Sequence, residues 1–354
     1  MKLIVLTKRR PQNRDLLTRP YGRFYHVPRL LAQFGAELHI VLANYESEPE
    51  ITIKQDGMTF HSLNMLPNLP RFYLRIRQLC QKAQPDVIIG FSDTWFGIIA
   101  ATLAKASNAK LVIDAYDNYE AYLPSAKPLH WLWRRALGKA DGLTAAGPQL
   151  LELLRRSNSK AHHRVIPMAA DPAFQPKELY ESRHALNLPL KRKLIGYLGT
   201  ADSTRGFDLF LDALDLLGKR RDDFDLVLSG RTKVKTNLPE QRFHRLGYVA
   251  DELMPDLINS CDLLVCVNKD SAFGSYSYPV KIYEALSCRR PVLASDTAPA
   301  RWILGGEERC LAKLEDADDL SEKLNSLLDE PVLLPQPPGW NYSATIFKSL
   351  LESL

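Results

Sequence analysis

The sequence predicts an α/β protein built of two doubly wound, Rossmann-like domains. Short, fully apolar runs alternate with amphipathic helical patterns along all 354 residues. Apolar strands separated by helices are typical of parallel sheets that are covered on both faces. Each half of the chain contains several such runs, and a chain of this length has room for two domains of about 150 residues. We therefore expect one sheet in each half.

The predicted strands fall into two sets. In the first half they lie at 3–6, 38–42, 87–91, 111–113, 143–145 and 165–166, and in the second half at 194–198, 226–228, 243–246, 263–267, 292–294 and 311–313. Between them, residues 27–34 and 207–217 place apolar side chains at helical spacing, which predicts amphipathic helices. Sheets of this kind bind ligands beyond the carboxyl ends of their strands, so two facing sheets would form a cleft.

Two proline-rich segments predict the domain boundaries. Residues 166–176 (IPMAADPAFQP) lack helical periodicity, and residues 331–339 (PVLLPQPPG) precede a last helical pattern that starts at Asn341. We expect an N-terminal domain over 1–170, a C-terminal domain over 171–335, and a terminal helix over 336–354.

The composition argues against a disulfide-rich, zinc-binding, secreted or membrane-spanning protein. The five cysteines are scattered without a CxxC pair, which argues against a disulfide framework or a zinc site. The N-terminal apolar run is too short for a signal peptide, and no stretch approaches the ~20 apolar residues of a membrane span. These features predict a cytoplasmic protein. The net charge of +5 fits an anionic ligand or an anionic lipid surface as well as it fits nucleic acid.

The first candidate site is the segment 278–284 (YPVKIYE). Pro279 suits the first turn of a helix, where free N–H groups and the positive dipole end favour a phosphate. Glu284 would lie about one and a half turns further on, on the face that it shares with Val280 and Lys281. A carboxylate there can accept hydrogen bonds from the two hydroxyls of a ribose. The same spacing also fits a surface glutamate that pairs with Lys281.

A second candidate site follows a predicted strand at Gly199. A polar loop leads from Gly199 to a helix near Gly206, and a glycine-bordered turn lets an anion approach the backbone. Arg205 stands at the start of this helix and can neutralise a pyrophosphate. The alternative is a solvated arginine beside a turn glycine. The GxGxxG pattern is absent, so no dinucleotide fingerprint is predicted.

The N-terminal half offers a basic loop and an acidic strand end. Residues 7–23 form a long, poorly periodic segment whose Lys and Arg side chains can attract a phosphate-bearing acceptor or can simply be solvated. Asp117, in the run 114–120 (DAYDNYE), can bind a sugar hydroxyl or act as a base; a turn or cap role is the alternative. His162 and His163 have no acid or cysteine near them in sequence and are expected at the surface.

Two segments combine basic and aromatic residues. Residues 71–83 (RFYLRIRQLCQKA) place apolar side chains on one stripe, and residues 127–139 (KPLHWLWRRALGK) carry two tryptophans and two adjacent arginines. Either segment can lie on an anionic membrane surface. Either can equally be an ordinary helix that faces the core.

Several segments, taken in order, resemble the retaining GT-B glycosyltransferases of family 4. RVIPMAADPAFQP is similar to the family's interdomain segment, YLGTADSTRGFDLFLDAL to its KG-containing loop and helix, and RLGYVADELMPDLINSCDLLVCVN to the segment that follows. YEALSCRRPVLASD is similar to the segment that carries the family's second glutamate, and WNYSATIFKSLLESL to a last helix that crosses back to the N-terminal domain. The similarity spans about 165 to the C-terminus and is weaker before that.

The resemblance implies roles for the matching residues. Glu284 matches the glutamate that holds the ribose, and Arg205 matches the lysine that faces the donor phosphates. Thr200 stands where the family has its arginine, and Arg231 is a candidate substitute. The expected donor-binding set is Gly199, Thr200, Arg205, Gly230, Arg231, Val249, Tyr276, Tyr278, Val280, Lys281 and Glu284. The expected acceptor-side set is Gly22, Arg23 and Asp117, and the catalytic candidates are Arg205 and Asp117.

The largest departure from the family lies eight residues before Glu284. Tyr276 stands there in place of the family's first glutamate, which helps to position the transferred sugar. Pro279, Lys281 and Glu284 instead fit a Pro-x-Lys-x-x-Glu pattern that some relatives carry.

The resemblance implies a hexosyltransferase that moves a sugar from a UDP- or GDP-linked donor to a glycan or lipid-linked acceptor in the synthesis of bacterial surface polysaccharide or glycoconjugates. Such chemistry rests on positioning and on electrostatic stabilisation of the leaving group, so no cofactor and no essential metal are expected. A peripheral contact with the inner face of an anionic membrane is compatible with this role, and nucleic acid is not an expected partner. A catalytically silent nucleotide-sugar-binding protein and a sugar-nucleotide epimerase are the alternatives.

Overall fold

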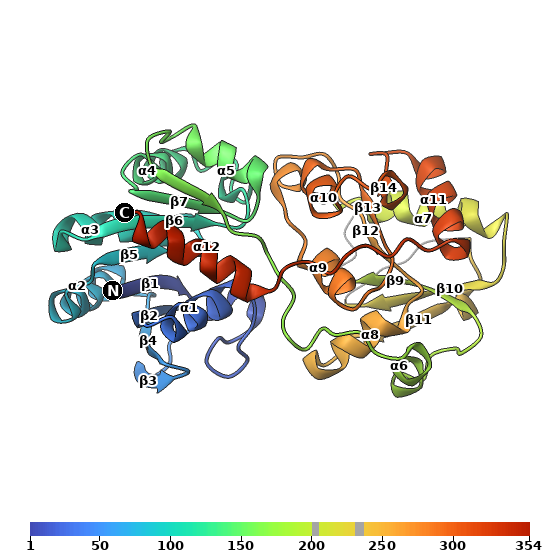
Figure 1. The fold of residues 1–354 in the computed structure, drawn as a ribbon, viewed down its shortest axis with the longest axis horizontal. Helices are drawn as coiled ribbons and strands as arrows, with labels where there is room; N and C mark the ends of the chain where they lie inside the picture. The colour runs from blue at the N-terminus through green and yellow to red at the C-terminus, as the bar shows by residue number, and fades with distance from the viewer. Residues whose placement is uncertain (200–204, 231–236) are drawn as a thin grey trace. The chain divides into compact units, whose positions relative to one another are not determined.

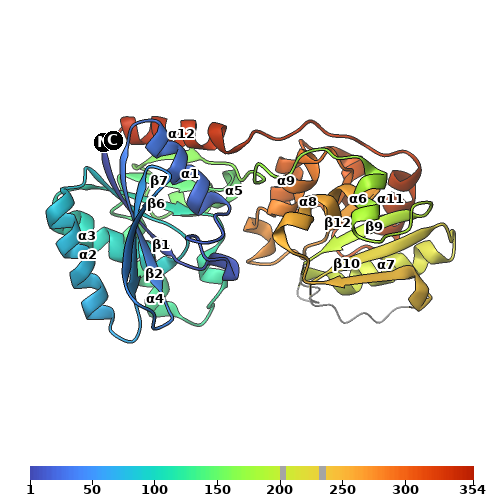
Figure 2. The same ribbon diagram turned by 90° about the horizontal axis from the view of Figure 1, so that it is seen from below.

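The computed structural model describes residues 1–199, 205–230 and 237–354. The chain divides into two compact units, the first formed by Met1–Met168 with Pro338–Leu354 and the second by Ala169–Pro337. The boundaries expected near 170 and 335 lie within three residues of this division. Each unit has helices packed on a mainly parallel sheet (Figures 1 and 2), which confirms the expected fold class.

The first unit contains an eight-stranded sheet in the order β3-β4-β2-β1-β5-β6-β7-β8. All neighbouring strands are parallel except β3 and β4, which form an antiparallel hairpin at the edge. The strands are β1 (Lys2–Lys8), β2 (Glu37–Asn44), β3 (Ile51–Gln55), β4 (Met58–Asn64), β5 (Val87–Gly90), β6 (Lys110–Ala115), β7 (Gly142–Ala145) and β8 (His162–Val165).

The hairpin of β3 and β4 was not expected, because β3 has no buried residue, β4 mixes buried and partly exposed residues, and neither strand forms an apolar run. Asp56 and Gly57 connect the two strands, both with positive φ (51° and 78°). An Asp-Gly pair is a strong sequence signal for a two-residue hairpin turn. That local signal could have identified the hairpin.

Helices cover both faces of the first sheet. On one face α1 (Arg23–Gln33) packs against α12 (Trp340–Glu352), so the last helix of the chain belongs to this unit, as expected. The neighbouring helices α2 (Leu69–Ala83), α3 (Thr94–Ser107) and α4 (Lys127–Leu137) form a separate layer, and α5 (Pro148–Arg155) packs on β7 and β8. The buried side chains of β1, including Leu3, Ile4 and Val5, form the centre of the core.

The second unit contains the six strands that the apolar runs predict, in the order β11-β10-β9-β12-β13-β14. They are all parallel: β9 (Lys193–Leu198), β10 (Phe224–Ser229), β11 (Phe243–Gly247), β12 (Leu263–Cys266), β13 (Val292–Ser295) and β14 (Leu311–Ala312). The helices are α6 (Leu179–Ala185), α7 (Phe207–Gly218), α8 (Met254–Ser260), α9 (Val280–Ser287), α10 (Ala298–Ile303) and α11 (Ala317–Asp329).

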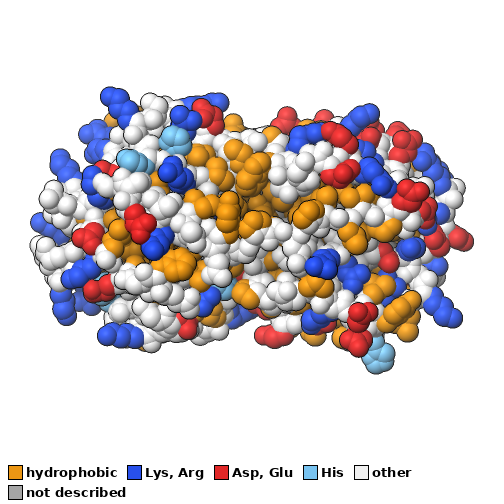
Figure 3. Space-filling model, viewed as in Figure 1, with side chains coloured by type: hydrophobic (Ala, Val, Ile, Leu, Met, Phe, Trp, Pro, Cys, Tyr) orange, Lys and Arg blue, Asp and Glu red, His pale blue; other side chains and the backbone are white. Residues whose placement is uncertain are grey.

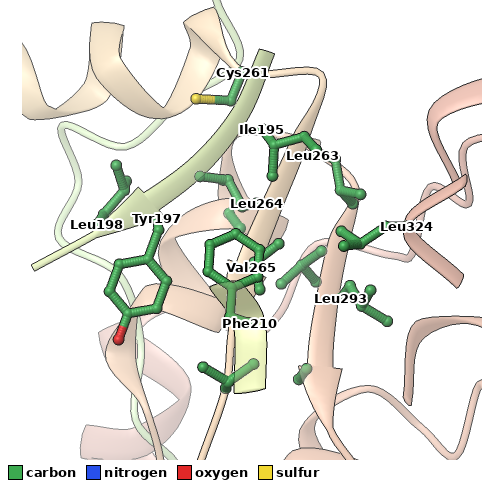
Figure 4. Close-up of a cluster of buried hydrophobic side chains, with 14 of the residues drawn as sticks. Ile195, Tyr197, Leu198, Phe210, Cys261, Leu263, Leu264, Val265, Leu293 and Leu324 are labelled. Carbon is green, nitrogen blue, oxygen red and sulfur yellow. The ribbon is translucent and has the colours of Figure 1, made fainter. Parts of the chain in front are cut away.

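The core of the second unit follows from the predicted periodicity of α7. Phe207, Phe210, Leu214 and Leu217 are buried, and α7 packs against α11. Figure 4 shows Phe210 within a cluster that includes side chains from strands β9, β12 and β13. The apolar runs therefore predict the interior of this unit well.

Two further observations bear on sequence expectations. The five cysteines, all of which lie in the described ranges, form no disulfide. Among the helices of the described ranges, none is both long and apolar enough to cross a bilayer.

Candidate functional site

The strand order of the second unit predicts where a ligand would bind. Its first strand, β9, lies between β10 and β12, and the chain leaves β9 toward one side and later returns on the other. A doubly wound sheet opens a crevice at such a switch point, beyond the carboxyl ends of the two central strands. The residues that follow β9 and β12, together with the start of α9, therefore form the candidate site.

Three glycines end the neighbouring strands β9, β10 and β11. Gly199, Gly230 and Gly247 all have positive φ, at 105°, 86° and 61°. A Cβ on Gly230 would lie 2.9 Å from backbone atoms of Gly199, and a Cβ on Gly199 would overlap Nζ of Lys281. Glycine at position 199 thus leaves the space that the ammonium group of Lys281 occupies.

Lys281 lies in the first turn of α9, close to Arg205, Cys266 and Glu284. Part of its surface is exposed, but crowding by the surrounding protein lowers its pKa, and the charge of Arg205 acts in the same direction. Cys266 and Glu284 have the opposite effect. In the described ranges, neither Lys281 nor Arg205 forms an ion pair with a carboxylate. Two cations therefore share one strand end.

Arg205 directly precedes Gly206, the N-cap of α7, as the sequence predicts. Its guanidinium carbon lies 5.4 Å from the centre of the Phe273 ring, a cation–π distance. Aromatic contact can hold the guanidinium near the strand ends while its N–H groups stay available to an anion. Thr200 and Arg231, which were expected to complete this basic set, lie outside the described residues.

Glu284 lies in the second turn of α9 and is only 5% exposed. The alternative of a surface glutamate paired with Lys281 does not fit this burial. Pro279 is the N-cap of α9 with extended ψ (117°), one position earlier than the first-turn place expected for it. Glu284 and Lys281 both lie near the start of α9, so this helix brings a buried carboxylate and an ammonium to one end of the sheet.

The remaining donor-side candidates have mixed surroundings. Tyr278 is buried and its ring meets that of Trp302 edge to face, with centroids 5.7 Å apart, which is a packing contact. Tyr276 and Val280 are partly exposed near the start of α9, and Val249, two residues after β11, packs on the hydrophobic core. Their assignment to a ligand stays a prediction.

Cys266 is a member of this site that sequence reasoning missed. It is the last residue of β12, and burial raises the pKa of its thiol although Lys281 and Arg205 oppose that effect. The thiol is therefore an uncharged group that lines the site. Its place at a strand end was the only signal in the sequence.

Arg23 has a different environment from the one expected. It is the first residue of α1, follows Gly22 (φ 65°), and is only 2% exposed. Its guanidinium forms a bidentate pair with Asp114 at 2.8 and 2.5 Å and donates to the carbonyl of Ile166 at 2.6 Å. Arg23 therefore stabilises the interior of the first unit, and the interpretation of it as part of a solvated basic loop is wrong.

The rest of the basic loop is also partly neutralised by acidic side chains. Arg9 pairs with Asp15 at 2.9 Å and with Glu48 at 2.5 Å, and Arg10 pairs with Glu48 at 2.6 Å. These partners are distant in sequence or separated by turns, so the charge count of the loop alone did not reveal them. The pairing weakens the case for a phosphate-binding loop.

Asp117 lies after β6 and is buried. The hydroxyl of Tyr122 donates a hydrogen bond of 2.5 Å to its carboxylate. Burial raises the pKa of Tyr122, and the charge of Asp117 adds to the effect. Asp117 is thus held by an aromatic neighbour, and its role toward an acceptor stays a prediction. In the described ranges no three His, Cys, Asp or Glu side chains are grouped to hold a metal ion.

Comparison with known proteins places both units in one family. A model described as a glycosyl transferase 4-like domain matches residues 23–169, and one described as glycosyl transferases group 1 matches residues 192–330. The structure of HepE from Anabaena in complex with UDP has a TM-score of 0.72 at 15% identity, over 100% of this chain and 99% of that one. This similarity shows the shared fold.

Two sequence relatives agree with the domain matches. A Bacillus subtilis protein named as a teichuronic acid biosynthesis glycosyltransferase, TuaC, is 25% identical over 258 residues, 71% of this chain and 64% of that protein. The lipopolysaccharide core biosynthesis mannosyltransferase LpsB of Rhizobium meliloti is 26% identical over 212 residues, 56% of this chain and 57% of that protein. The chain thus spans less than two thirds of each relative. With one domain model on each unit, it belongs to the GT-B glycosyltransferases of group 1, family 4-like.

Proposed function

We propose that this protein is a retaining glycosyltransferase whose donor, a UDP- or GDP-linked sugar, binds at the carboxyl ends of β9 and β12. The observation that carries the proposal is the ammonium of Lys281 in the space left by Gly199, with Arg205 close by. Two cations at a switch point suit a nucleoside diphosphate. The acceptor would be a glycan or a lipid-linked glycan of a bacterial surface polysaccharide or glycoconjugate.

The proposed chemistry needs little covalent help from the protein. Arg205 and Lys281 would stabilise the negative charge that develops on the leaving pyrophosphate, and α9 would present its first N–H groups to the same anion. Glu284, buried one turn deeper, would accept hydrogen bonds from the ribose hydroxyls. Tyr276 stands where the family has its first glutamate, so the transferred sugar would be held by other groups.

The names of the relatives support the same role. TuaC and LpsB are both named for the synthesis of bacterial surface polysaccharides, and HepE was solved with UDP. On the acceptor side, Gly22 and Asp117 remain our candidates, with Asp117 binding a sugar hydroxyl or accepting a proton. We propose no essential metal, and the proposed location is the cytoplasm, with the membrane contact argued in the next subsection.

The test is nucleotide binding by the full chain, measured by thermal shift and calorimetry with UDP, GDP, ADP, dTDP and their sugar conjugates. One nucleotide at ~100 times its dissociation constant should stabilise the protein by about 2.7 kcal/mol. Lys281→Ala and Arg205→Ala should each weaken binding roughly tenfold or more, because a hydrogen bond to a charged group contributes about 1.5–3 kcal/mol. Lys313→Ala, which removes an exposed lysine of the same unit, is the control and should bind normally.

Turnover assays separate the candidate functions. Donor consumption that requires an acceptor supports the transferase. Tight binding without turnover would instead show a silent nucleotide-sugar-binding protein, and conversion of the donor without acceptor would show an epimerase. Normal binding by both Lys281→Ala and Arg205→Ala would contradict the site assignment.

A further inference from the structure

The outward face of α4 and the loop before it combines exposed apolar side chains with cations. Trp131 is 59% exposed, Leu123 is 56% exposed and Leu132 is 39% exposed. Lys127 and Arg135 lie on the same helix and are exposed. We propose that this face, here called the α4 surface, docks the protein on an anionic lipid bilayer.

The exposure of the α4 surface is a consequence of how α4 packs. The inward side of the helix is formed by His130, Trp133, Ala136 and Leu137, all of which are buried. Trp133 packs on the ring of Tyr119, with centroids 5.6 Å apart, and lies so close to Gly97 that a Cβ there would overlap its ring. The core therefore uses Trp133, whereas Trp131, two residues earlier, lies on the opposite side and needs another explanation.

The surroundings of Trp131 are positively charged. Residues 121–140 and 153–170 contain no Asp or Glu, although they contain several Lys and Arg residues. Glu120, which directly precedes the first of these stretches, is engaged by Arg134 in a bidentate pair at 2.8 and 2.5 Å. The guanidinium of Arg135 lies 5.3 Å from the centre of the Trp131 ring. An anionic partner would meet little opposing negative charge here.

An open pocket of about 460 Å³ lies within this surface. Trp131, Arg134, Arg135 and Ser157 line it, so α4 and the turn after α5 both contribute. Arg134 already pairs with Glu120, which leaves Arg135 to bind a phosphate, and an indole is favoured at the boundary between hydrocarbon and water. The pocket can thus admit the phosphate of a lipid headgroup while Leu123 and Leu132 reach the apolar region. In Figure 3, which views the first unit from the side of α12, Lys, Arg and His side chains gather at the upper left; Figure 2 places α4 on the opposite side of that unit.

Lipid fits this surface better than nucleic acid does. Phosphates of either could satisfy the arginines, but only a bilayer offers an apolar phase to leucine and tryptophan side chains that point outward. The helix also shows the pattern of an interfacial segment, with one face buried in protein and an aromatic and basic face outside.

Helix α2 provides a matched comparison, since its sequence suggested a membrane contact equally. Leu74 is 53% exposed there and Arg75 lies beside it. Arg75, however, faces Glu50 at 3.5 Å, whereas Arg135 of α4 belongs to no ion pair among the described residues. A cation that already has an acidic partner contributes less to binding an anionic membrane, so α2 should not bind it.

The experiment is co-sedimentation of the full chain, without nucleotide, with vesicles of phosphatidylcholine alone or mixed equally with phosphatidylglycerol. Binding should require phosphatidylglycerol and should fall with added salt. Arg135→Gln should weaken it about fivefold, because a cation at an anionic surface contributes about 1 kcal/mol. Trp131→Ala should weaken it roughly tenfold through lost apolar burial. Both side chains are exposed, so neither change should disturb folding, and nucleotide binding should persist in both variants.

Leu74→Ser and Arg75→Gln are the controls on α2 and should bind vesicles as the unaltered chain does. Equal losses for the α2 and α4 variants would overturn the proposal, as would equal sedimentation with pure phosphatidylcholine or none with either vesicle. Inorganic phosphate is the competitor: displacement from the vesicles by low concentrations of phosphate would show a phosphate pocket and not a bilayer surface. Light scattering gives a further check, since self-association abolished by Trp131→Ala would identify a second copy of the chain as the occupant.

Discussion

The two units share one strand order, but the side chains at their central strand ends differ in how their charges are paired. The order β4-β2-β1-β5-β6-β7 in the first unit corresponds to β11-β10-β9-β12-β13-β14 in the second. In both, the helix after the first strand packs against a helix that follows the last strand, α1 with α12 and α7 with α11. Topology therefore creates an equivalent switch point in each unit.

At the switch point of the first unit, the protein satisfies its own polar groups. The hydroxyl of Thr7 donates to that of Ser92 at 3.0 Å, and Lys8 pairs with Asp93 at 2.8 Å. At the switch point of the second unit, Lys281 and Arg205 share the strand ends without a carboxylate ion pair among the described residues. The fold brings strand ends together at a switch point in both units. Whether those strand ends can bind an anion depends on the charged side chains around them.

The largest expected effect is on stability and comes from the buried ion pair of Arg23 and Asp114 in the first unit. Asp114→Ala should destabilise the protein by about 3–5 kcal/mol, because it leaves the buried guanidinium of Arg23 unpaired. Arg205→Ala, in the second unit, should cost less than about 1 kcal/mol. Urea denaturation followed by circular dichroism measures both. A double variant, Arg23→Met with Asp114→Leu, should recover much of the loss, and similar costs for Asp114→Ala and Arg205→Ala would break the comparison.

The next effect concerns the glycine that makes room for Lys281. Gly199→Ala and Gly247→Ala both put a side chain on a left-handed backbone and should each cost about 1–2 kcal/mol of stability. Only Gly199→Ala should also lower nucleotide affinity, by about tenfold or more, since its Cβ displaces Nζ of Lys281, whereas a Cβ at Gly247 meets no atom of the described residues within 4 Å. Calorimetric titration with the nucleotide compares them, and equal affinities would show that the ammonium is not needed at that place.

A smaller effect should appear in the pH dependence of nucleotide binding. Crowding by the surrounding protein and the charge of Arg205 lower the pKa of Lys281, so the ammonium loses its proton at a lower pH than an ordinary lysine does. Binding of an anion needs the charged form, and affinity should therefore fall, by up to about tenfold, as the pH rises toward about 10.4, the ordinary pKa of lysine, and the fall should begin below that value. Lys281→Arg keeps its charge over this range and should flatten the profile. An unchanged profile in that variant would assign the titration to another group.

The smallest expected effect is a loss of stability at low pH that comes from a histidine of the first sheet. Burial, with help from His39 and Lys82, lowers the pKa of His61 on β4 to about 4. Because the folded pKa lies below that of the unfolded chain, stability is full above about pH 6.5 and is lost as the pH falls toward 4. After allowance for solvent screening, the loss should be on the order of 1 kcal/mol. His61→Gln should reduce the difference in Tm between about pH 7 and about pH 5; an equal difference would exclude this histidine as its source.

The parts of the fold that were predicted are those with apolar runs. Strands buried on both faces are mostly apolar, and that is why β9, β10, β12, β13 and β14 could be identified without a structure, while the edge strand β11 is only partly buried. The edge hairpin of β3 and β4 is half exposed, so its alternating pattern was overlooked although Asp56 and Gly57 mark its turn. A fully buried strand is recognisable in the sequence as an apolar run, whereas a half-buried strand gives a weaker pattern.

Site residues divide along a similar line. Gly199, Arg205, Lys281 and Glu284 could be named from the sequence because each stands next to a strand end or a helix start, which local patterns reveal. Their proximity could not, since the approach of Lys281 to Gly199 and the electrostatic coupling of Lys281 to Arg205 and Glu284 depend on how β9, β12 and α9 are arranged.

The sequence by itself determined two parallel-sheet units, the assignment of the last helix to the first unit, and the segments that form the candidate site of the second unit. Only the tertiary structure decided which cations serve the interior and which remain for a ligand. Arg9 and Arg23 pair with Glu48 and Asp114, far along the chain, whereas Arg205 and Lys281 are near enough for the charge of one to lower the pKa of the other. The physical reason is that apolar burial follows the periodicity of a single element, while the state of a charge depends on every element packed around it.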